Sequence, residues 1–295
     1  MAGSLSGRWL YLRVRVNLLQ TLNNCAMQKN IDMLSVIRNP LVMKEKVALI
    51  TGASSGIGRS TTKLFVNDGW SVVGVGRNQN ELSNLRMDVK DSPGIFHAHL
   101  ADLTETSQVD HLISETLEQL ARIDVVVNAA GVIKNGNIAD TTLHEWDRMM
   151  EINLRSVFYL MHKCVPSLEQ TKGNIVNISS VAGTRAFPNV LAYCVSKAAV
   201  DQLTRCAALE LAPKGIRVNA VNPGVVVTNL HKRGGMEASA YEKFLDHSKS
   251  THPLGRVGTP DEVADLVFYL ASEKASWITG ATYEIDGGRG QTCAR

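Results

Sequence analysis

A tyrosine and a lysine four residues apart are the pair in this sequence best suited to move a proton. They are Tyr193 and Lys197, and residues at this spacing share one face of a helix. An ammonium group beside a phenol favours the phenolate and lowers the pKa of the tyrosine. The pair therefore predicts a tyrosine that donates and accepts a proton near neutral pH.

The same spacing recurs at Tyr159 and Lys163, so the pair alone does not identify a site. The segment upstream of Tyr193 separates the two copies, because a short apolar run ends there at Ser179 and Ser180. Sites in doubly wound sheets gather at the carboxyl ends of strands. This position favours Tyr193 over Tyr159.

A glycine-rich turn, Thr51–Gly58, directly follows a buried-looking strand and opens a helix. Because glycine has no Cβ, the backbone can turn sharply and approach a pyrophosphate, and the helix start offers free N–H groups to the anion. A P-loop would need glycine at Ala53 and lysine at Arg59, which argues against a nucleoside triphosphatase. The turn predicts dinucleotide binding by the following residues: Gly52, Ser54, Ser55, Gly56, Ile57 and Gly58.

The end of the second strand-like run distinguishes the two nicotinamide dinucleotides. An NAD site places an acidic residue there to bind the ribose 2′-hydroxyl, but residues 71–80 contain no Asp or Glu. They contain Arg77 followed by Asn78, and a guanidinium can pair with a 2′-phosphate through two hydrogen bonds. Arg77 therefore favours NADP(H) over NAD(H); the alternative is a solvated surface arginine.

Strands that alternate with helices are needed to position these groups. Short apolar runs alternate with segments of helical length at 56–68, 106–121, 143–163 and 190–212. This pattern predicts one α/β domain over residues 43–295, with a doubly wound, Rossmann-type parallel sheet of about seven strands and helices on both faces. The expected strands are Val47–Thr51, Ser71–Gly76, Ile95–Leu100, Ile123–Asn128, Asn174–Ile178, Val218–Val221 and Ala281–Ile285.

Over residues 44–288 the chain resembles the short-chain dehydrogenase/reductase family. In that family the catalytic serine precedes the tyrosine by thirteen residues, as Ser180 precedes Tyr193 here. The residue thirteen before Tyr159 is Trp146, which leaves Tyr159 and Lys163 as helix surface or interface. The matching landmarks, in chain order, are Thr51–Gly58, Asp102, Asn128-Ala129-Ala130-Gly131, Asn153, Ser180, Tyr193 with Lys197, and Pro223-Gly224 followed by Thr228.

The resemblance implies four catalytic residues. Ser180 would stabilise charge on the substrate oxygen, and Tyr193 would pass the proton. Lys197 would lower the pKa of Tyr193 and hold the nicotinamide ribose. Asn153 would position a water molecule that links Lys197 to solvent.

The resemblance also implies cofactor contacts, with Asp102 at the adenine and Thr228 at the nicotinamide amide. Ala129 stands where the family usually has asparagine, and Ser55 where some NADP-preferring relatives carry a basic residue. The NADP(H) prediction therefore rests mainly on Arg77. The remaining contacts expected are Asn78, Leu103, Asn128, Ala129, Gly131, Tyr193, Lys197, Pro223, Gly224 and Val226.

Composition and charge argue against nucleic-acid-binding, membrane-spanning and metal-binding proteins. Thirty-one basic and 28 acidic residues give a net charge of +3 without a basic run, so we expect no nucleic-acid binding. The sequence contains no run of 18 apolar residues, so no membrane-spanning helix is expected. His97 and His99 share a strand face but lack further ligands nearby, so no metal is expected. Five cysteines without a C-x-x-C pair indicate reduced thiols.

The first 42 residues differ from the rest of the chain. Residues 1–31 contain three arginines and one lysine, and the first acidic residue is Asp32. This pattern predicts either a mitochondrial transit peptide or a disordered tail ahead of an internal start such as Met43. We therefore expect a cytoplasmic or mitochondrial-matrix protein with an N-terminal extension over residues 1–42.

These observations predict an oxidoreductase that moves a hydride between NADP(H) and a carbonyl or secondary alcohol. Residues 228–253, hinged at Gly234 and Gly235, would form a lid over the substrate. The segment from His252 to Gly288 resembles the tail of 3-oxoacyl-thioester reductases, so a 3-oxoacyl thioester is the leading substrate. Small ketones, diketones or steroids are the alternative substrates. The alternative function is a non-catalytic NADP(H)-binding sensor. The resemblance also implies a homotetramer or homodimer.

Overall fold

The computed structural model describes residues 45–292. These residues belong almost entirely to one compact unit, Lys46–Arg295. The predicted extension, residues 1–42, lies outside the described residues, so its interpretation as a transit peptide or tail stays a prediction.

Seven parallel strands form one sheet in the order β3-β2-β1-β4-β5-β6-β7. The fold class predicted from the sequence is confirmed, with small shifts in the strand ends. The chain winds outward from β1 in one direction and then from β4 in the other, which puts a topological switch point between these two strands. The strands are β1 Val47–Thr51, β2 Ser71–Gly76, β3 Ile95–Leu100, β4 Val125–Asn128, β5 Asn174–Ile178, β6 Arg217–Pro223 and β7 Thr282–Ile285.

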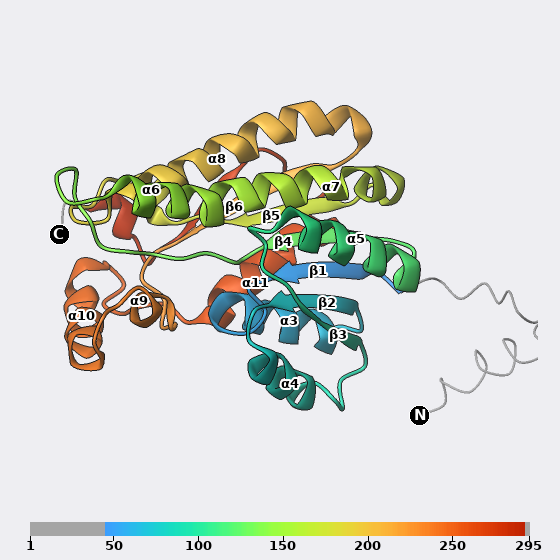
Figure 1. Ribbon diagram of the computed structural model, residues 1–295, viewed down its shortest axis with the longest axis horizontal. Coiled ribbons are helices and arrows are strands. Elements are labelled where there is room, and N and C mark those ends of the chain that lie inside the picture. Colours follow the sequence, from blue (N-terminus) through green and yellow to red (C-terminus); the bar gives the residue numbers. More distant parts are fainter. Residues whose placement is uncertain (1–44, 293–295) are drawn as a thin grey trace, which may run out of the picture. The chain divides into compact units, whose positions relative to one another are not determined.

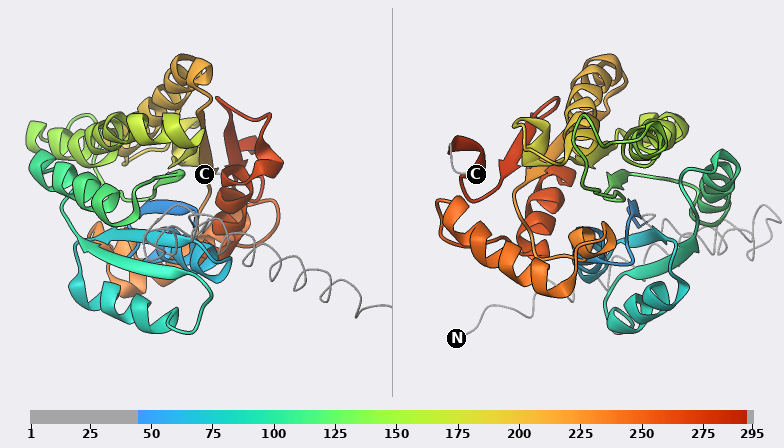
Figure 2. Two further views of the ribbon diagram at one scale, coloured as in Figure 1. Left: turned by 90° about the vertical axis from the view of Figure 1, so that its right-hand side faces the viewer. Right: turned by 60° about the vertical axis from the view of Figure 1, so that its left-hand side comes forward.

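Helices cover both faces of the sheet (Figures 1 and 2). One layer contains α5, α7 and α8, and the other contains α3, α4 and α11, in which α3 and α11 pack side by side. The helices are α3 Gly56–Asn67, α4 Gln79–Asp88, α5 Thr106–Leu120, α6 Leu143–Met150, α7 Ser156–Thr171, α8 Leu191–Leu211, α9 Leu230–Arg233, α10 Ala238–Thr251 and α11 Pro260–Ala271.

Alternating side chains of each strand enter two separate cores. In β1, Ala48 and Ile50 belong to the core under α3, α4 and α11. Leu49 points the other way, into the core under α5, α7 and α8. Because both faces are covered, β1 is apolar at nearly every position rather than at every second one. Because both of its faces are packed, the sheet is a firm support for the loops at the carboxyl ends of its strands.

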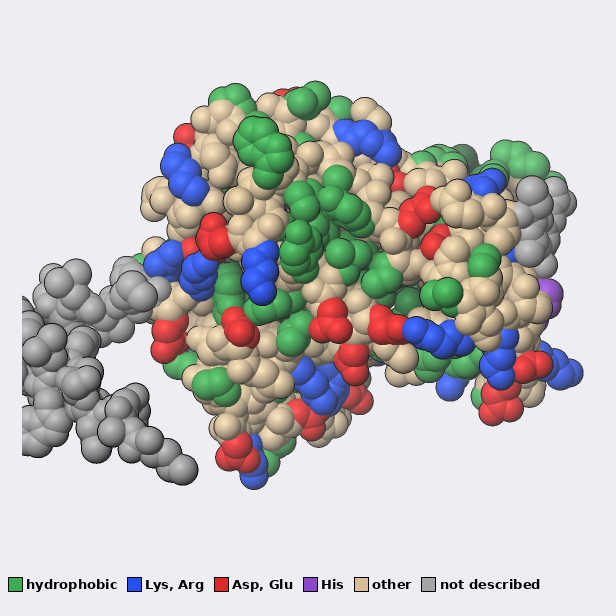
Figure 3. Space-filling view, turned by 180° about the vertical axis from the view of Figure 1, so that it is seen from behind, with side chains coloured by type: hydrophobic (Ala, Val, Ile, Leu, Met, Phe, Trp, Pro, Cys, Tyr) green, Lys and Arg blue, Asp and Glu red, His purple; other side chains and the backbone are tan. Residues whose placement is uncertain are grey.

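The surface carries both signs of charge. On the face that Figure 3 shows, Lys and Arg side chains are interspersed with Asp and Glu, and hydrophobic side chains gather near the centre. Among the described helices, none is both long enough and apolar enough to cross a membrane. The described residues also contain no cluster of three or more His, Cys, Asp or Glu side chains arranged to hold a metal.

Candidate active site

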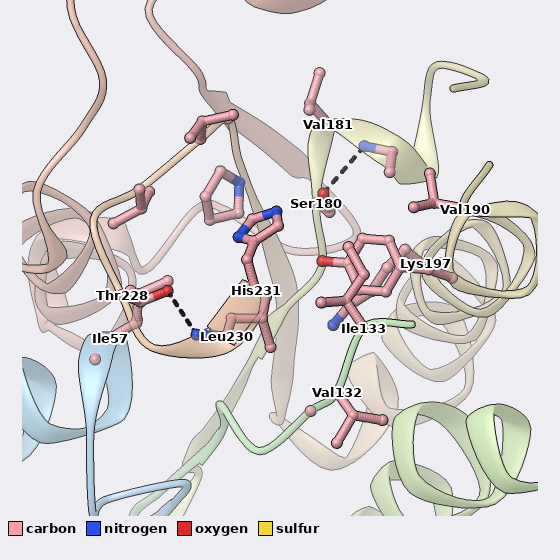
Figure 4. Close-up of a pocket in the computed structure, with 18 of the residues that line it drawn as sticks. Ile57, Val132, Ile133, Ser180, Val181, Val190, Lys197, Thr228, Leu230 and His231 are labelled. Carbon is pink, nitrogen blue, oxygen red and sulfur yellow. Dashed lines mark hydrogen bonds between the residues drawn. The ribbon is translucent and has the colours of Figure 1, made fainter. Parts of the chain in front are cut away.

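A cavity of about 460 Å³ opens at the carboxyl ends of the central strands. Its floor comes from the glycine turn after β1 and from residues 129–131 after β4. One wall carries Ser180, Tyr193 and Lys197, and the opposite wall is the segment from Thr228 through α10 (Figure 4). The cavity therefore lies over the switch point of the sheet, where ligands bind in such folds.

The glycine turn is shaped by backbone packing. Gly52 has φ +68°, and a Cβ there would lie 2.8 Å from the carbonyl oxygen of Ala129. A Cβ on Gly58 would lie 2.5 Å from the carbonyl oxygen of Gly52. A side chain at Gly56 would press on the Thr228 methyl group at 3.1 Å. The turn is thus a close-packed cradle that opens directly into the first turn of α3.

The chain after β4 is tied to this turn by one hydroxyl. Thr51 Oγ1 accepts hydrogen bonds from the backbone N–H groups of Ala129, at 3.0 Å, and Ala130, at 3.1 Å. Asn128 is buried and donates to the Asn177 side chain at 2.8 Å. Asn128 therefore links β4 to β5 below the cavity, and the small residues after it line the floor.

Asn153 occupies a π-helical segment, Glu151–Arg155, between α6 and α7. Its side chain accepts from the backbone N–H of Val132 at 2.9 Å and donates to the Val132 carbonyl oxygen at 2.9 Å. The Asn153 amide also lies 3.1 Å from Ser196 Oγ on α8. A Cβ on Gly131 would lie 3.3 Å from Asn153 Oδ1 and 3.7 Å from Lys197 Nζ. Asn153 therefore sits next to Lys197 behind the cavity floor, and π-turns of this kind occur often at functional sites.

Ser180, Tyr193 and Lys197 come from two elements that meet at the end of β5. Ser180 follows β5, and its Oγ accepts from the Ala182 N–H at 3.1 Å. Tyr193 and Lys197 lie one turn apart on α8, with Lys197 Nζ 5.8 Å from the centre of the Tyr193 ring. Lys197 Nζ donates to the carbonyl oxygen of Ile178 at 2.7 Å. All three polar groups are buried in the wall and face the same space.

The pKa of Tyr193 differs from the expectation. Burial raises the pKa of Tyr193 to about 12, and a hydrogen bond with Ser180 offsets only part of that rise. The pKa of Tyr193 in the protein by itself is therefore raised, which is opposite to the lowering expected from Lys197. Because a buried phenolate loses its hydration, the neutral phenol is favoured. Tyr193 thus carries a proton at neutral pH.

Lys197 is buried as well, and burial lowers its pKa to about 8, while Asp201 raises it by less. Asp201 is buried one helical turn further along α8, and the Asn222 amide donates to its carboxylate at 2.9 Å. The amine of Lys197 consequently exchanges its proton near neutral pH more readily than an exposed lysine would.

Arg77 and Asp102 lie outside the cavity, at the ends of β2 and β3. Arg77 Nη1 is 3.5 Å from Asp102 Oδ2, and both side chains are partly exposed. Asn78 caps α4 by accepting from the Glu81 N–H at 3.1 Å. The Asp102 carboxylate also accepts from Thr104. The predicted cofactor residues Ser54, Gly58 and Leu103 likewise do not line the cavity.

The lid is anchored by residues that carry no signal in the sequence. Tyr241 Oη accepts from the Thr228 N–H at 3.2 Å and donates to the Thr228 carbonyl oxygen at 2.8 Å. His252 Nε2 accepts from the Val225 N–H at 3.1 Å. The predicted hinge joins α9 to α10, and Gly235 has φ +98°. The predicted contacts Pro223, Gly224, Val226 and Thr228 line the cavity.

The second tyrosine–lysine pair lies elsewhere. Tyr159 donates to Asp110 on α5 at 2.9 Å, and Lys163 Nζ is 2.8 Å from the same carboxylate. Neither residue lines the cavity. This pair joins α7 to α5, in line with its interpretation as helix surface.

Comparisons with known proteins agree with this geometry. Residues 52–289 match a family model described as enoyl-(acyl carrier protein) reductase. A curated relative, the 3-oxoacyl-(acyl-carrier-protein) reductase of Thermotoga maritima, is 36% identical over 83% of this chain and 98% of its own. The chain belongs to the short-chain dehydrogenase/reductase family. The family resemblance identified in the sequence is thereby confirmed.

Other members of the short-chain dehydrogenase/reductase family show its breadth. A cyclohexanol dehydrogenase from an Acinetobacter species is 36% identical over 82% of this chain and 94% of its own. A crystal structure of a Caenorhabditis elegans member of unknown function, with cofactor, superposes with a TM-score of 0.79 at 36% identity, covering 84% of this chain and 96% of that one. The relatives support an oxidoreductase that acts on carbonyl or hydroxyl groups.

Proposed function

We propose that this protein transfers a hydride between NADP(H) and a carbonyl or secondary-alcohol substrate. One observation carries the proposal: the polar ends of Ser180, Tyr193 and Lys197 share one wall of a cavity whose floor is a glycine cradle at a helix start. The cradle suits a pyrophosphate because its N–H groups are accessible and no Cβ intervenes. When bound, the nicotinamide supplies or accepts the hydride.

The chain's own residues then handle orientation and the proton. Ser180 would hold the carbonyl oxygen by a hydrogen bond, which stabilises the charge that develops there. Tyr193 would donate its phenolic proton to the same oxygen as the carbonyl becomes an alcohol. The raised pKa of Tyr193 suits this direction, because the phenol is protonated before the reaction. Lys197, with a pKa of about 8, would return a proton to the phenolate. Asn153, next to Lys197 behind the cavity floor, would position a water molecule that links Lys197 to solvent.

The leading substrate is a 3-oxoacyl thioester, as in the relative from Thermotoga maritima. Small ketones, diketones and steroids are the alternatives, and the Acinetobacter relative acts on cyclohexanol. The test is NADPH oxidation by the full-length chain with an acetoacetyl thioester, a diketone, a ketosteroid and cyclohexanone, with NADH in parallel. NADPH binding without turnover of any substrate would instead support a non-catalytic sensor.

Replacement of the proposed proton donor gives the sharpest test of the mechanism. Tyr193→Phe should reduce kcat by at least about a hundredfold, because general acid catalysis contributes that much, while NADPH binding changes little. Tyr159→Phe is the matched control, since Tyr159 has the same lysine spacing but contacts Asp110 outside the cavity. Near-normal turnover by Tyr193→Phe would sink the assignment.

The choice of cofactor rests on Arg77. Its guanidinium lies at the end of β2, with 57% of the side chain exposed, and is held beside Asp102. Arg77→Ala should weaken NADPH binding by about tenfold or more, because charged hydrogen bonds to a phosphate are lost. NADH binding should change little. Titration of cofactor fluorescence measures both constants, and equal weakening of the two would refute a 2′-phosphate role.

A further inference from the structure

His231 is a titratable side chain of the lid that the mechanism above does not use. It lies on α9, and Figure 4 shows its imidazole standing between the Thr228–Leu230 turn and Ser180. The ring packs on Phe244, with 4.6 Å between the ring centres, and lies 6.3 Å from the ring of Tyr241. Two aromatic neighbours on α10 therefore fix the ring in the cavity wall.

The described residues do not satisfy the nitrogens of this imidazole. Nδ1 is buried and has no hydrogen-bond partner among them, and they form no hydrogen bond with Nε2 either. Buried polar atoms are almost always bonded, so an exception calls for an explanation such as a role in ligand binding. By contrast, His252 nearby has partners for both of its ring nitrogens.

The protonation state of His231 follows from its surroundings. Burial lowers the pKa of His231, so the ring is neutral at physiological pH and carries one N–H. An N–H on Nδ1 would be buried without an acceptor, and orphaned buried N–H groups are rarer than under-satisfied acceptors. The tautomer with the proton on Nε2 is therefore favoured, and its N–H is available to a molecule in the cavity.

The cavity wall itself supplies no strong acceptor for this N–H. None of the described residues that line the cavity is Asp or Glu. The side chains around the substrate end are mainly apolar, among them Ile133, Val181, Val190 and Met236. Because none of the described residues bonds Nε2, an oxygen of the bound substrate is a suitable acceptor for His231. Ser180 and Tyr193 are already committed to the reacting oxygen in the proposed function.

We propose that His231 binds a second oxygen of the substrate and so selects carbonyl compounds that carry an acceptor oxygen near the reacting carbonyl. This inference rests on the proposed function and narrows its substrate class. The 3-oxo esters, 3-oxo thioesters and diketones have such an oxygen, whereas simple monoketones do not. A site built to bond a substrate oxygen discriminates against analogues that lack it, because its own polar group is then left unpaired.

The test compares two substrates of nearly equal shape, ethyl acetoacetate and 2-heptanone, with NADPH and the full-length chain. His231→Phe keeps a ring against Phe244 but removes the donor. It should lower kcat/KM for ethyl acetoacetate by about tenfold, the loss of one buried hydrogen bond, and leave 2-heptanone within about twofold. His231→Gln, which retains an N–H donor, should restore most of the preference. His162→Phe, at a histidine outside the cavity whose ring stacks on Phe158, should leave the ratio unchanged.

Each other outcome has a defined meaning. Equal losses on both substrates would assign His231 to packing alone, and an unchanged ratio would show that the ring does not contact the substrate; either result overturns the inference. If the wild type reduces neither of these substrates nor any substrate of the panel given above, the proposed function fails. Calorimetry of ethyl acetoacetate with the NADP⁺-bound protein still decides the role of His231, because that complex cannot react. Equal binding by wild type and His231→Phe, or none by either, overturns the inference.

Discussion

At the end of β5, the surroundings of Lys197 disfavour its positive charge but hold its amine in a fixed position. Burial disfavours its charge and lowers its pKa to about 8, whereas the bond to the Ile178 carbonyl oxygen, at 2.7 Å, holds the amine in place. A charge kept in such surroundings lowers the stability of the folded state. Placing the Lys197 amine at this position therefore lowers the stability of the folded protein.

This conflict predicts a pH-dependent stability difference. The pKa of Lys197 is lower in the folded chain than in the unfolded chain, so the unfolded chain binds more protons between pH 8 and about 10.5. The contribution of Lys197 to stability should therefore rise with pH in that window and be least favourable below it. Relative to Lys197→Met, the wild type should gain about 2 kcal/mol between about pH 7.5 and pH 10.

Urea unfolding of both proteins at the two pH values measures this difference. Titrations of groups that Lys197 does not influence cancel, because both proteins share them. A difference between variant and wild type that does not change with pH would contradict the lowered pKa.

At the residue scale, the sequence was informative where chemistry needs a fixed spacing. Tyr193, Lys197 and Ser180 were found because one helical turn and one strand end bring them together, and the structure places them on one wall. The predicted direction of the Tyr193 pKa shift is wrong, because burial raises the pKa and residue spacing does not show burial. His231 was missed because a lone histidine in a lid has no motif, and only its lack of partners singles it out.

At the element scale, the glycine cradle joins β1, β4 and α3 through close backbone contacts and the Thr51 hydroxyl. Gly58→Ala should weaken NADPH binding by about tenfold or more, and should cost about 1–3 kcal/mol of stability, because the added Cβ overpacks against a backbone that cannot yield. That Cβ would lie 2.5 Å from the Gly52 carbonyl oxygen. Fluorescence titration and thermal unfolding measure the two effects.

Gly258→Ala provides the matched control, because its new Cβ would approach no atom closer than 3.5 Å. We expect nearly normal cofactor binding from this variant. Full binding by Gly58→Ala would show that the turn can relax and that the close packing is not required.

The elements themselves were largely predictable, and their irregularities were not. Continuous apolar runs gave the strands, since a parallel sheet is buried on both faces. The segment 143–163 was expected to be one helical stretch, but it contains α6, a π-helical turn at Glu151–Arg155 and part of α7. Asn153, within this turn, bonds Val132 in the chain after β4, and no local sequence pattern signals that contact.

At the scale of the whole molecule, several large apolar side chains face solvent. Trp277 is 98% exposed, and Leu209 and Phe158, on α8 and α7, are 80% and 52% exposed. Exposed apolar groups often mark contact surfaces. The homotetramer or homodimer implied by the family resemblance stays a prediction, and analytical ultracentrifugation of the full-length chain measures it directly.

The winding of the sheet also has a consequence for the order in which the protein is made. The first three strands are complete at Leu100, but β1 gains its second neighbour only when β4 is synthesised, from Val125 onward. The cavity also needs the lid through Thr251 and, near the end of the chain, Arg289. During translation the glycine turn is therefore made early, but the cavity is complete only after most of the chain has been synthesised. Non-local parallel strand pairing is also slow, which lengthens this interval. A chain terminated after β5 would expose an unpaired strand edge and present no binding site, which makes it a natural client for chaperones or proteases.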